Sequence, residues 1–301
     1  MRILVTGSSG LVGAALVEQL LREGNTVFRL IRPESKASGA GTAVGWNPAA
    51  GEIDAAAAQG ADAVVHLAGA SIADGRWNEA RKALLRSSRV ETTRQLVKAL
   101  ARLKPAPKVL VAASAVGYYG NRGDELLTEE SPPGTDFLAE LARDWEAEAA
   151  KGEAWGMRVV RLRFGVVLAK SGGALAKMLP PFRLGAGGRL GSGRQWMSWL
   201  ALDEAVGMIR FALENEAARG ALNAVAPEPA RNADFTRALA KALRRPAIFP
   251  APEFALRLVL GEMADALLLS SQRAVPKRLQ ELDYRFAHPE LGEALAAALR
   301  E

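Results

Sequence analysis

Three glycines near the N-terminus have the spacing of a phosphate-binding turn. Residues 6–13 read Thr-Gly-Ser-Ser-Gly-Leu-Val-Gly, which contains the pattern TGxxGxxG. The first glycine permits a tight turn, the second lets the backbone approach a pyrophosphate, and the third lets a helix pack close to the preceding strand. Amide groups at the start of that helix attract phosphate oxygens. The residues expected to bind a dinucleotide here are Thr6, Gly7, Ser9, Gly10, Leu11, Val12 and Gly13.

The segments on both sides of this turn favour a cofactor site over a purely structural turn. Residues 3–5 form a short apolar strand, and residues 11–21 have the composition of an apolar helix. Glycines with this spacing also occur in turns that bind no nucleotide, but a strand before the turn and a helix after it are typical of dinucleotide binding.

The end of the second expected strand, residues 26–32, bears on the choice of dinucleotide. Enzymes that select NAD usually carry an acid here to bind the ribose diol. This chain has Arg32, followed by Ser35 and Lys36. A guanidinium can stack on adenine and pair with a 2′-phosphate, although an ordinary basic turn would look the same. Because the acid is missing, we expect NADP(H), with NAD(H) as the second choice.

Hydroxyl groups that could handle a proton follow a later strand, residues 108–114. Ser114 ends that strand, and Tyr118 and Tyr119 follow it. A serine can orient a carbonyl or alcohol and a tyrosine can transfer its proton, but without a neighbouring cation the tyrosine pKa stays at about 10. The alternative is that both tyrosines pack and hydrogen-bond in a loop. The acids at 124, 125, 129 and 130 could act as bases, but the expected role is a solvated loop face.

Arg194 is the candidate for substrate binding. It precedes an expected strand at residues 196–202, where its guanidinium could form a pair of hydrogen bonds to a phosphate or carboxylate. A surface ion pair is an equal alternative.

The elements that must position these residues alternate between strands and helices over the first two-thirds of the chain. Strands are expected at 26–32, 61–69, 108–114 and 157–163, and helices at 11–22, 78–103 and 136–150. This order predicts an α/β fold, a Rossmann-type doubly wound parallel sheet with a smaller, mostly helical C-terminal substrate region. The dinucleotide-binding domain is expected at 1–168, with 196–226 returning to its sheet. Residues 169–195 and 227–301 would form the substrate region.

Composition excludes several classes of function. The 301 residues contain no cysteine and two histidines, which leaves no disulfide or thiolate metal site and little basis for a histidine metal site or a serine-histidine hydrolase. The net charge is +6, but basic and acidic residues are interleaved, so no nucleic-acid partner is expected. The chain opens directly into a strand and has no long apolar run, which predicts no membrane partner and a cytoplasmic location.

Taken together, these motifs resemble the extended short-chain dehydrogenase/reductase superfamily. The resemblance rests on the glycine turn, the strand end at 66–69, Ser114, the segment 163–166, and the segment from Gly193 that carries Arg194. A closer resemblance is to the atypical epimerase family of the human SDR39U1-like branch, with its C-terminal domain of unknown function. The marks of that branch span most of the chain: GRW at 75–77, SRV at 88–90, SAVGYYG at 114–120, RDWE at 143–146, RQWMSW at 194–199, PEP at 227–229 and GEM at 261–263.

The resemblance implies further site residues and an activity. It implies that Leu67, Ala68, Gly69, Phe164, Gly165 and Val166 bind the cofactor. It implies a hydride-transferring, epimerase/dehydratase-like oxidoreductase acting on a nucleotide-sugar-like or small carbonyl or hydroxyl substrate, and it allows a homodimer.

The chain departs from the superfamily in its proton-transfer residues. The usual YxxxK pair falls on Phe137 and Leu141, or on Leu141 and Trp145, and these side chains transfer no proton. The expectation is therefore an NADP-binding oxidoreductase with a non-standard acid/base. The alternative is a catalytically silent NADP(H)-sensing protein that regulates a partner.

Overall fold

The computed structural model describes residues 1–34 and 39–300, so Ser35 and Lys36 lie outside the described residues. An eight-stranded sheet has the order β12-β8-β6-β5-β1-β2-β3-β4, and every neighbouring pair is parallel except β3 with β4. Its strands are β1 (Arg2–Thr6), β2 (Thr26–Ile31), β3 (Thr42–Asn47), β4 (Glu52–Ile53), β5 (Ala63–His66), β6 (Val109–Ala115), β8 (Arg158–Phe164) and β12 (Gly220–Ala224). The doubly wound parallel sheet expected from the sequence is confirmed.

The direction of winding reverses at β1. The chain proceeds from β1 to β2 and β3 on one side, and then returns to place β5, β6, β8 and β12 on the other. Ligands of open parallel sheets bind at the carboxyl ends of the strands beside such a reversal. The glycine turn leaves β1 at this point.

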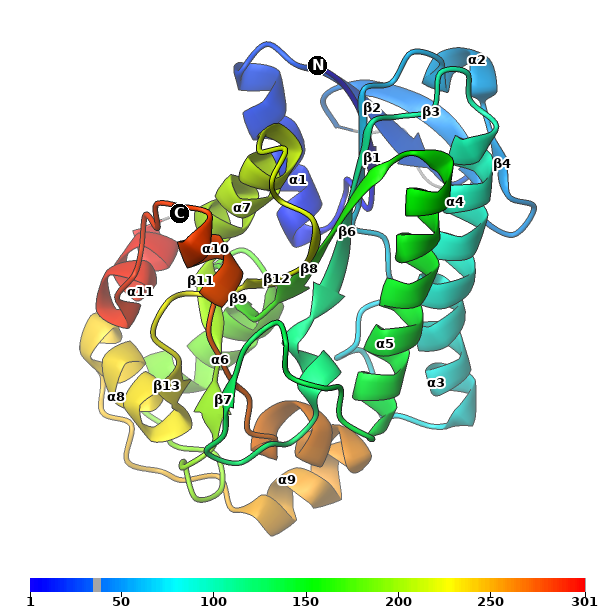
Figure 1. The fold of residues 1–301 in the computed structure, drawn as a ribbon. Coiled ribbons are helices and arrows are strands. Elements are labelled where there is room, and N and C mark those ends of the chain that lie inside the picture. Colours follow the sequence, from blue (N-terminus) through cyan, green and yellow to red (C-terminus); the bar gives the residue numbers. More distant parts are fainter. Residues whose placement is uncertain (35–38, 301) are drawn as a thin grey trace.

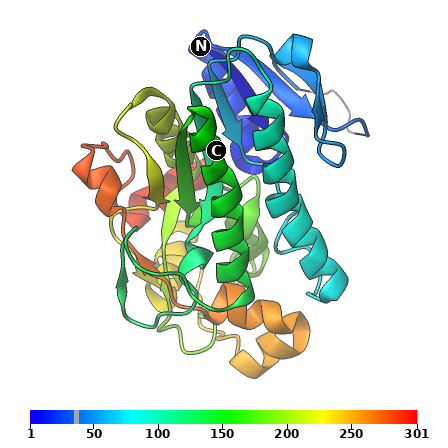
Figure 2. The ribbon, with the colours of Figure 1, turned by 45° about the vertical axis from the view of Figure 1, so that its right-hand side comes forward.

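Helices cover both faces of the sheet. On one face lie α1 (Leu11–Arg22) and α7 (Leu202–Glu214), and on the other α4 (Thr92–Ala101) and α5 (Phe137–Ala150), which run side by side (Figures 1 and 2). Successive side chains of a strand point to opposite faces. Ile3 and Val5 accordingly pack in the core under α1, whereas Leu4 packs in the core under α4. Because both faces are covered, β1 and β5 are apolar over most of their length.

The helix expected at 78–103 is interrupted in its middle. It consists of α3 (Glu79–Arg86), a five-residue π-helical segment, Ser87–Glu91, and α4. Asn78 begins it by accepting a hydrogen bond from the Arg81 amide (2.8 Å). A π-helical turn is rare, and such turns are found often at functional sites.

The C-terminal residues form a mostly helical region, part of which lies beyond the carboxyl ends of the strands (Figure 1). Its helices are α6 (Gly173–Arg183), α8 (Asn232–Leu243), α9 (Glu253–Leu260), α10 (Lys277–Glu281) and α11 (Leu291–Arg300). The short elements elsewhere are α2 (Ala55–Ala58), β7 (Leu126–Leu127), β9 (Val166–Leu168), β10 (Trp196–Met197), β11 (Trp199–Ala201), β13 (Ala230–Arg231) and β14 (Arg273–Ala274). None of the described helices is long and apolar enough to cross a membrane.

Only part of the segment 196–226 joins the main sheet. β12 is its edge strand, but β10 pairs with β13 and β11 pairs with β9. Ser198, between β10 and β11, donates a hydrogen bond to the Gln272 carbonyl (2.9 Å) and accepts one from the Ala274 amide (2.9 Å). These bonds hold the 196–201 segment against the C-terminal part of the chain rather than in the sheet.

Candidate functional site

Close backbone contacts explain why glycine is required at these positions of the turn. Gly7 has φ +67°, and a Cβ atom there would lie 2.7 Å from the carbonyl group of Leu67. A Cβ on Gly13 would lie 2.1 Å from the Gly7 oxygen, and one on Gly10 would lie 3.3 Å from the same atom. The turn is therefore packed against both the end of β5 and the first turn of α1.

The N-terminus of α1 fits an anionic ligand. The first amide groups of a helix have no intrahelical acceptor. Gly10, the residue before α1, has no side chain to accept from them, and the first turn of the helix carries no acid. These free donors and the positive end of the helix dipole suit the pyrophosphate of a dinucleotide. Leu11 is half-buried here, whereas Ser9 is exposed.

Thr6 joins the turn to the neighbouring strand. Its hydroxyl oxygen accepts hydrogen bonds from the amides of Leu67 and Ala68 (both 3.2 Å) and lies 2.7 Å from Nδ1 of His66. Because the two amides occupy the oxygen lone pairs, the hydroxyl proton goes to Nδ1, and Nε2 then donates to Thr93 (2.8 Å). Burial lowers the pKa of His66 to about 4, so the ring is neutral at pH 7. Thr6 and His66 thus align the carboxyl ends of β1 and β5.

Arg32 lies on the surface directly after β2. Its side chain is 62% exposed, and its Nε is 3.4 Å from a carboxylate oxygen of the equally exposed Glu34. An exposed ion pair of this kind is weak. The guanidinium is therefore available to a phosphate at this edge.

Ser114 is part of a buried polar chain that the sequence did not reveal. Its hydroxyl donates to Glu146 of α5 (2.7 Å), and Glu146 forms a two-point ion pair with Arg163 of β8, with N–O distances of 2.7 and 2.9 Å. All three residues are buried. The available signal was the charged Arg163 near the carboxyl end of a strand expected in the central sheet, because a buried charge requires a partner.

The two tyrosines after Ser114 lie in different environments. Tyr119 is fully buried, donates to the Asn223 side chain (2.6 Å) and accepts from Arg163 (2.9 Å). Burial raises the pKa of Tyr119 to about 12. Tyr118 is half-buried, its ring centroid lies 3.5 Å from Cζ of Arg163, and among the described residues its hydroxyl has no hydrogen-bond partner.

Apolar packing fills the positions of the absent YxxxK pair. Leu141 and Trp145 are buried in one cluster beneath α3, with Phe137 packed against it. The Phe137 ring also meets Trp77 edge to face, with centroids 5.4 Å apart. In neither alignment does α5 present a proton-transferring group at these positions.

The segment Phe164, Gly165 and Val166 joins β8 to β9 at the carboxyl edge. A Cβ on Gly165 would lie 2.4 Å from the Ser198 carbonyl oxygen, so the segment is packed against the strand that follows Arg194. Nearby, the backbone at Gly173 approaches Leu11, where a Cβ would lie 3.3 Å from the Leu11 side chain. The C-terminal region therefore reaches back to the start of α1.

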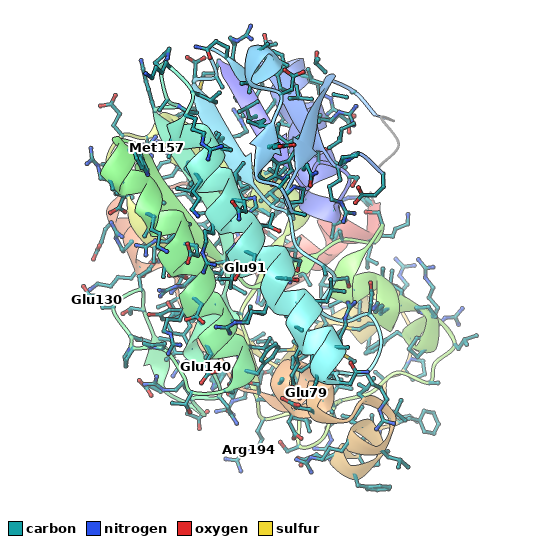
Figure 3. All side chains as sticks on the ribbon, turned by 90° about the vertical axis from the view of Figure 1, so that its right-hand side faces the viewer. Glu79, Glu91, Glu130, Glu140, Met157 and Arg194 are labelled. Carbon is teal, nitrogen blue, oxygen red and sulfur yellow. The ribbon has the colours of Figure 1, made fainter. Side chains whose placement is uncertain are left out.

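Arg194 lies in a separate, shallow pocket. It is exposed, at the end of the molecule away from Met157, which precedes β8 (Figure 3). The pocket has a volume of about 200 Å³ and is lined by Gly123, Asp124, Arg194, Gln195, Arg231 and Ser271. Asp124 accepts hydrogen bonds from Trp196 (2.7 Å) and Arg231 (3.0 Å), and these contacts lower its pKa. The pocket thus brings two arginines to one carboxylate.

Comparison with known proteins identifies the family to which this fold belongs. The model of the NAD dependent epimerase/dehydratase family matches residues 3–224, and that of a domain of unknown function, DUF1731, matches residues 251–298. An epimerase family protein of Mycobacterium tuberculosis, MT2273, is 43% identical over 98% of this chain and 97% of its own length. The human epimerase family protein SDR39U1 is 38% identical over 98% of both chains.

Solved structures of related proteins support the same family assignment. The crystal structure of human SDR39U1 (isoform 2) with NADPH is similar over the whole of both chains, with a TM-score of 0.88 and 35% identity. A nucleoside-diphosphate sugar epimerase from Corynebacterium glutamicum has a TM-score of 0.79 and 36% identity over 99% of this chain, which spans 58% of that protein. The glycine turn at the winding reversal, the matched domains and these relatives agree: the chain belongs to the NAD-dependent epimerase/dehydratase family, and it binds a nicotinamide dinucleotide.

Proposed function

We propose that this protein is an NADP(H)-dependent oxidoreductase that transfers a hydride to or from a carbon bearing oxygen. The observation that carries the proposal is the glycine turn, which opens at the same sheet edge as Ser114 and Tyr118. Preference for NADP(H) is supported by Arg32 in place of an acid after β2, and by the NADPH bound to the related human protein. A bound nicotinamide would supply the hydride acceptor or donor at this edge.

Tyr118 is the group that we assign to proton transfer. Its hydroxyl has no partner among the described residues, and Arg163 lies against its ring. This cation–π contact holds the Tyr118 ring in place. Tyr118 would donate its phenolic proton to the substrate oxygen when a carbonyl is reduced, and would take that proton back when the alcohol is oxidised.

Ser114 would orient the substrate oxygen. Its own proton is donated to Glu146, so the oxygen of Ser114 offers lone pairs to a substrate hydroxyl. Tyr119 is assigned a structural role instead, because its hydroxyl is already bound on both sides.

The proposed substrate is a nucleotide sugar or a small carbonyl or hydroxyl compound. The nucleotide-sugar class is supported by the name of the related Corynebacterium protein. Arg194 would bind an anionic group of the substrate, supported by Arg231 beside it. We further propose that residues 1–168 with β12 bind the cofactor, that 169–195 and 227–301 contact the substrate, and that the protein acts in the cytoplasm.

Substitutions of the adjacent residues Tyr118 and Tyr119 test the proposed proton transfer. Tyr118→Phe should lower kcat by about 100-fold or more, as loss of a general acid does, and leave the Kd for NADPH unchanged. Tyr119→Phe makes the same chemical change one residue away and should lower thermal stability while retaining most of the turnover. Turnover is measured as NADPH oxidation and NADP reduction with a panel of nucleotide sugars, aldehydes and ketones. A wild-type protein that binds no NADPH would refute the proposal.

A second candidate function is a catalytically silent NADP(H) sensor. It is favoured by the absence of tyrosine and lysine in α5 and by the commitment of the Ser114 proton to Glu146. NADPH binding without turnover of any panel compound, together with partner capture that changes with NADPH, would support it. Capture that is the same with and without NADPH would count against it.

A further inference from the structure

A basic groove lies at the amino ends of strands in the main sheet. Its volume is about 660 Å³, which is within the usual range for pockets that bind small molecules. Its described lining contains four cations and one acid, namely Lys108, Arg158, Arg219, Arg278 and Glu153. Among the described residues, those that line the groove include no aromatic side chain. Positive charge therefore dominates this groove.

The groove is remote from the sheet edge that carries the glycine turn. Arg158 begins β8 and Lys108 directly precedes β6, whereas Phe164 ends β8 at the opposite edge of the sheet. A strand of seven residues is roughly 20 Å long. Figure 3 shows Met157, which also lines the groove, at the end of the molecule away from Arg194. The groove is therefore separate from both the dinucleotide site and the Arg194 pocket.

The four cations of the groove have no carboxylate partners. Within residues 1–34 and 39–300, none of them forms a salt bridge. Burial and the neighbouring charge of Arg219 lower the pKa of Arg158. Glu216 has the opposite effect on that pKa, but it forms a salt bridge with neither arginine. Like charges held together repel one another, and an anion bound between them removes the repulsion.

Backbone contacts hold the three arginines in place but leave some of their donors unused. Arg158 donates three hydrogen bonds of 2.8–2.9 Å to carbonyl oxygens at the end of α7 and just after it. Arg278 donates to the Ala221 carbonyl (2.9 Å), and Nε of Arg219 donates to the Glu216 carbonyl (3.3 Å). A guanidinium has five N–H donors. Each of these arginines can therefore bind a further acceptor.

Arg161 brings another cation to the border of the groove. A Cβ on Gly220 would lie 3.2 Å from Nη1 of Arg278 and 3.4 Å from Nη2 of Arg161, so the two guanidinium groups converge at the start of β12. Nη1 of Arg161 is 3.9 Å from Glu146, which already forms two shorter bonds with Arg163. Within the described part of the chain, Nε of Arg161 is buried without a hydrogen-bond partner. The charge of Arg161 is thus only partly compensated.

The chemistry of the groove identifies a class of ligand. Guanidinium groups bind phosphate through pairs of hydrogen bonds, and an ammonium group binds it as a point charge. The lining side chains carry a net of three positive charges. A phosphate monoester carries a charge of about −1.5 to −2, so two phosphate groups match the groove better than one phosphate or a carboxylate. Without an aromatic side chain the lining offers no platform on which a nucleobase could stack.

We propose that this groove is a second ligand site, which binds a small molecule that carries two phosphate groups and no base. Arg158, Arg219 and Arg278 would hold the phosphate oxygens, together with the ammonium group of Lys108. The site is additional to the dinucleotide site, and the inference does not depend on the proposed function.

The test is a calorimetric titration of the full chain with pyrophosphate, inorganic phosphate and acetate. Saturating NADPH is present to occupy the glycine turn. Pyrophosphate should bind the wild-type protein at one site and more tightly than inorganic phosphate, and acetate should not bind. Lys108→Gln/Arg219→Gln replaces two exposed groove residues and should weaken pyrophosphate binding by about tenfold or more, the effect of losing a hydrogen bond to a charged group.

Two controls locate the binding. Arg183→Gln/Lys241→Gln removes the same charge from exposed residues of α6 and α8 and should bind pyrophosphate like wild type. Arg194→Gln should also bind it like wild type, because the Arg194 pocket is separate. Pyrophosphate should raise the unfolding temperature of the wild-type protein more than that of the groove variant.

Three results would overturn the inference. The first is a wild-type protein that binds no pyrophosphate. The second is a loss of affinity that is equal in the groove variant and in the Arg183→Gln/Lys241→Gln control, or that occurs only in Arg194→Gln. The third is binding to vesicles that contain phosphatidic acid without binding of pyrophosphate, which would assign the groove to a lipid surface.

Discussion

The turn after β1 and the polar chain behind Ser114 lie at the same sheet edge but use their polar groups in opposite ways. The turn consists of glycines and helix amides whose donors are left free by Gly10. In the polar chain, Ser114, Glu146 and Arg163 satisfy one another in a buried network. Groups left without partners are available to a ligand, whereas the buried ion pair of Glu146 and Arg163 mainly specifies the fold.

The same contrast appears in single pairs of similar residues. Among residues 1–34 and 39–300, the Tyr118 hydroxyl has no hydrogen-bond partner, whereas the Tyr119 hydroxyl has two. Within the same residues Arg89, in the π-helical segment, pairs with no carboxylate, whereas Arg163 makes two bonds to Glu146. Changes at the free member of each pair are expected to affect binding or turnover, and changes at the bound member to affect stability.

The largest expected effect comes from breaking the polar chain. Glu146→Gln removes the charge that compensates buried Arg163 and should lower the free energy of unfolding by about 3 kcal/mol or more. The Kd for NADPH of the folded variant should stay at the wild-type value. Chemical denaturation and NADPH titration measure the two effects, and Glu140→Gln, exposed on the same helix, should change neither. A variant as stable as wild type would contradict the structural role of the network.

His66 should make stability depend on pH. Its pKa is lowered from 6.5 to about 4 by burial, so the folded state binds fewer protons than the unfolded state below pH 6.5. Its contribution is fully present above that value and is lost as the pH falls toward about 4, by about 3 kcal/mol at 1.36 kcal/mol per unit. His66→Asn should lack this loss. The control His288→Asn keeps His66 and should retain it, and equal pH slopes in all three proteins would refute the assignment.

The smallest expected effect is the contribution of Arg32, after β2, to the affinity for NADPH. Arg32→Ala should weaken NADPH binding by about tenfold to a hundredfold, as expected for about 1.5–3 kcal/mol from a hydrogen bond to a charged group. NADH binding and thermal stability should be unchanged, since Arg32 is exposed. Arg22→Ala, another exposed arginine, serves as the control. Equal weakening of NADH and NADPH would show that Arg32 does not read the 2′-phosphate.

Local patterns sufficed for most of the sheet and helices. Apolar runs identified the central strands to within a few residues because those strands are buried on both faces. β3 and the edge strand β4 beside it were missed, since only the alternation of buried Val44 and Trp46 marks β3. The π-helical segment could not be predicted either, because its sequence continues the pattern of the α-helices on both sides.

The glycine turn, the parallel sheet, the family resemblance and the absence of the usual tyrosine-lysine pair could all be predicted from the amino-acid sequence, because each is carried by short segments with local patterns. Tertiary structure alone decided which polar groups meet. Glu146 and Arg163 are 17 residues apart, and Tyr119 and Asn223 are 104 apart. Helix and sheet packing brings such groups into the same interior, where burial requires each to find a partner and leaves the unpartnered ones to a ligand.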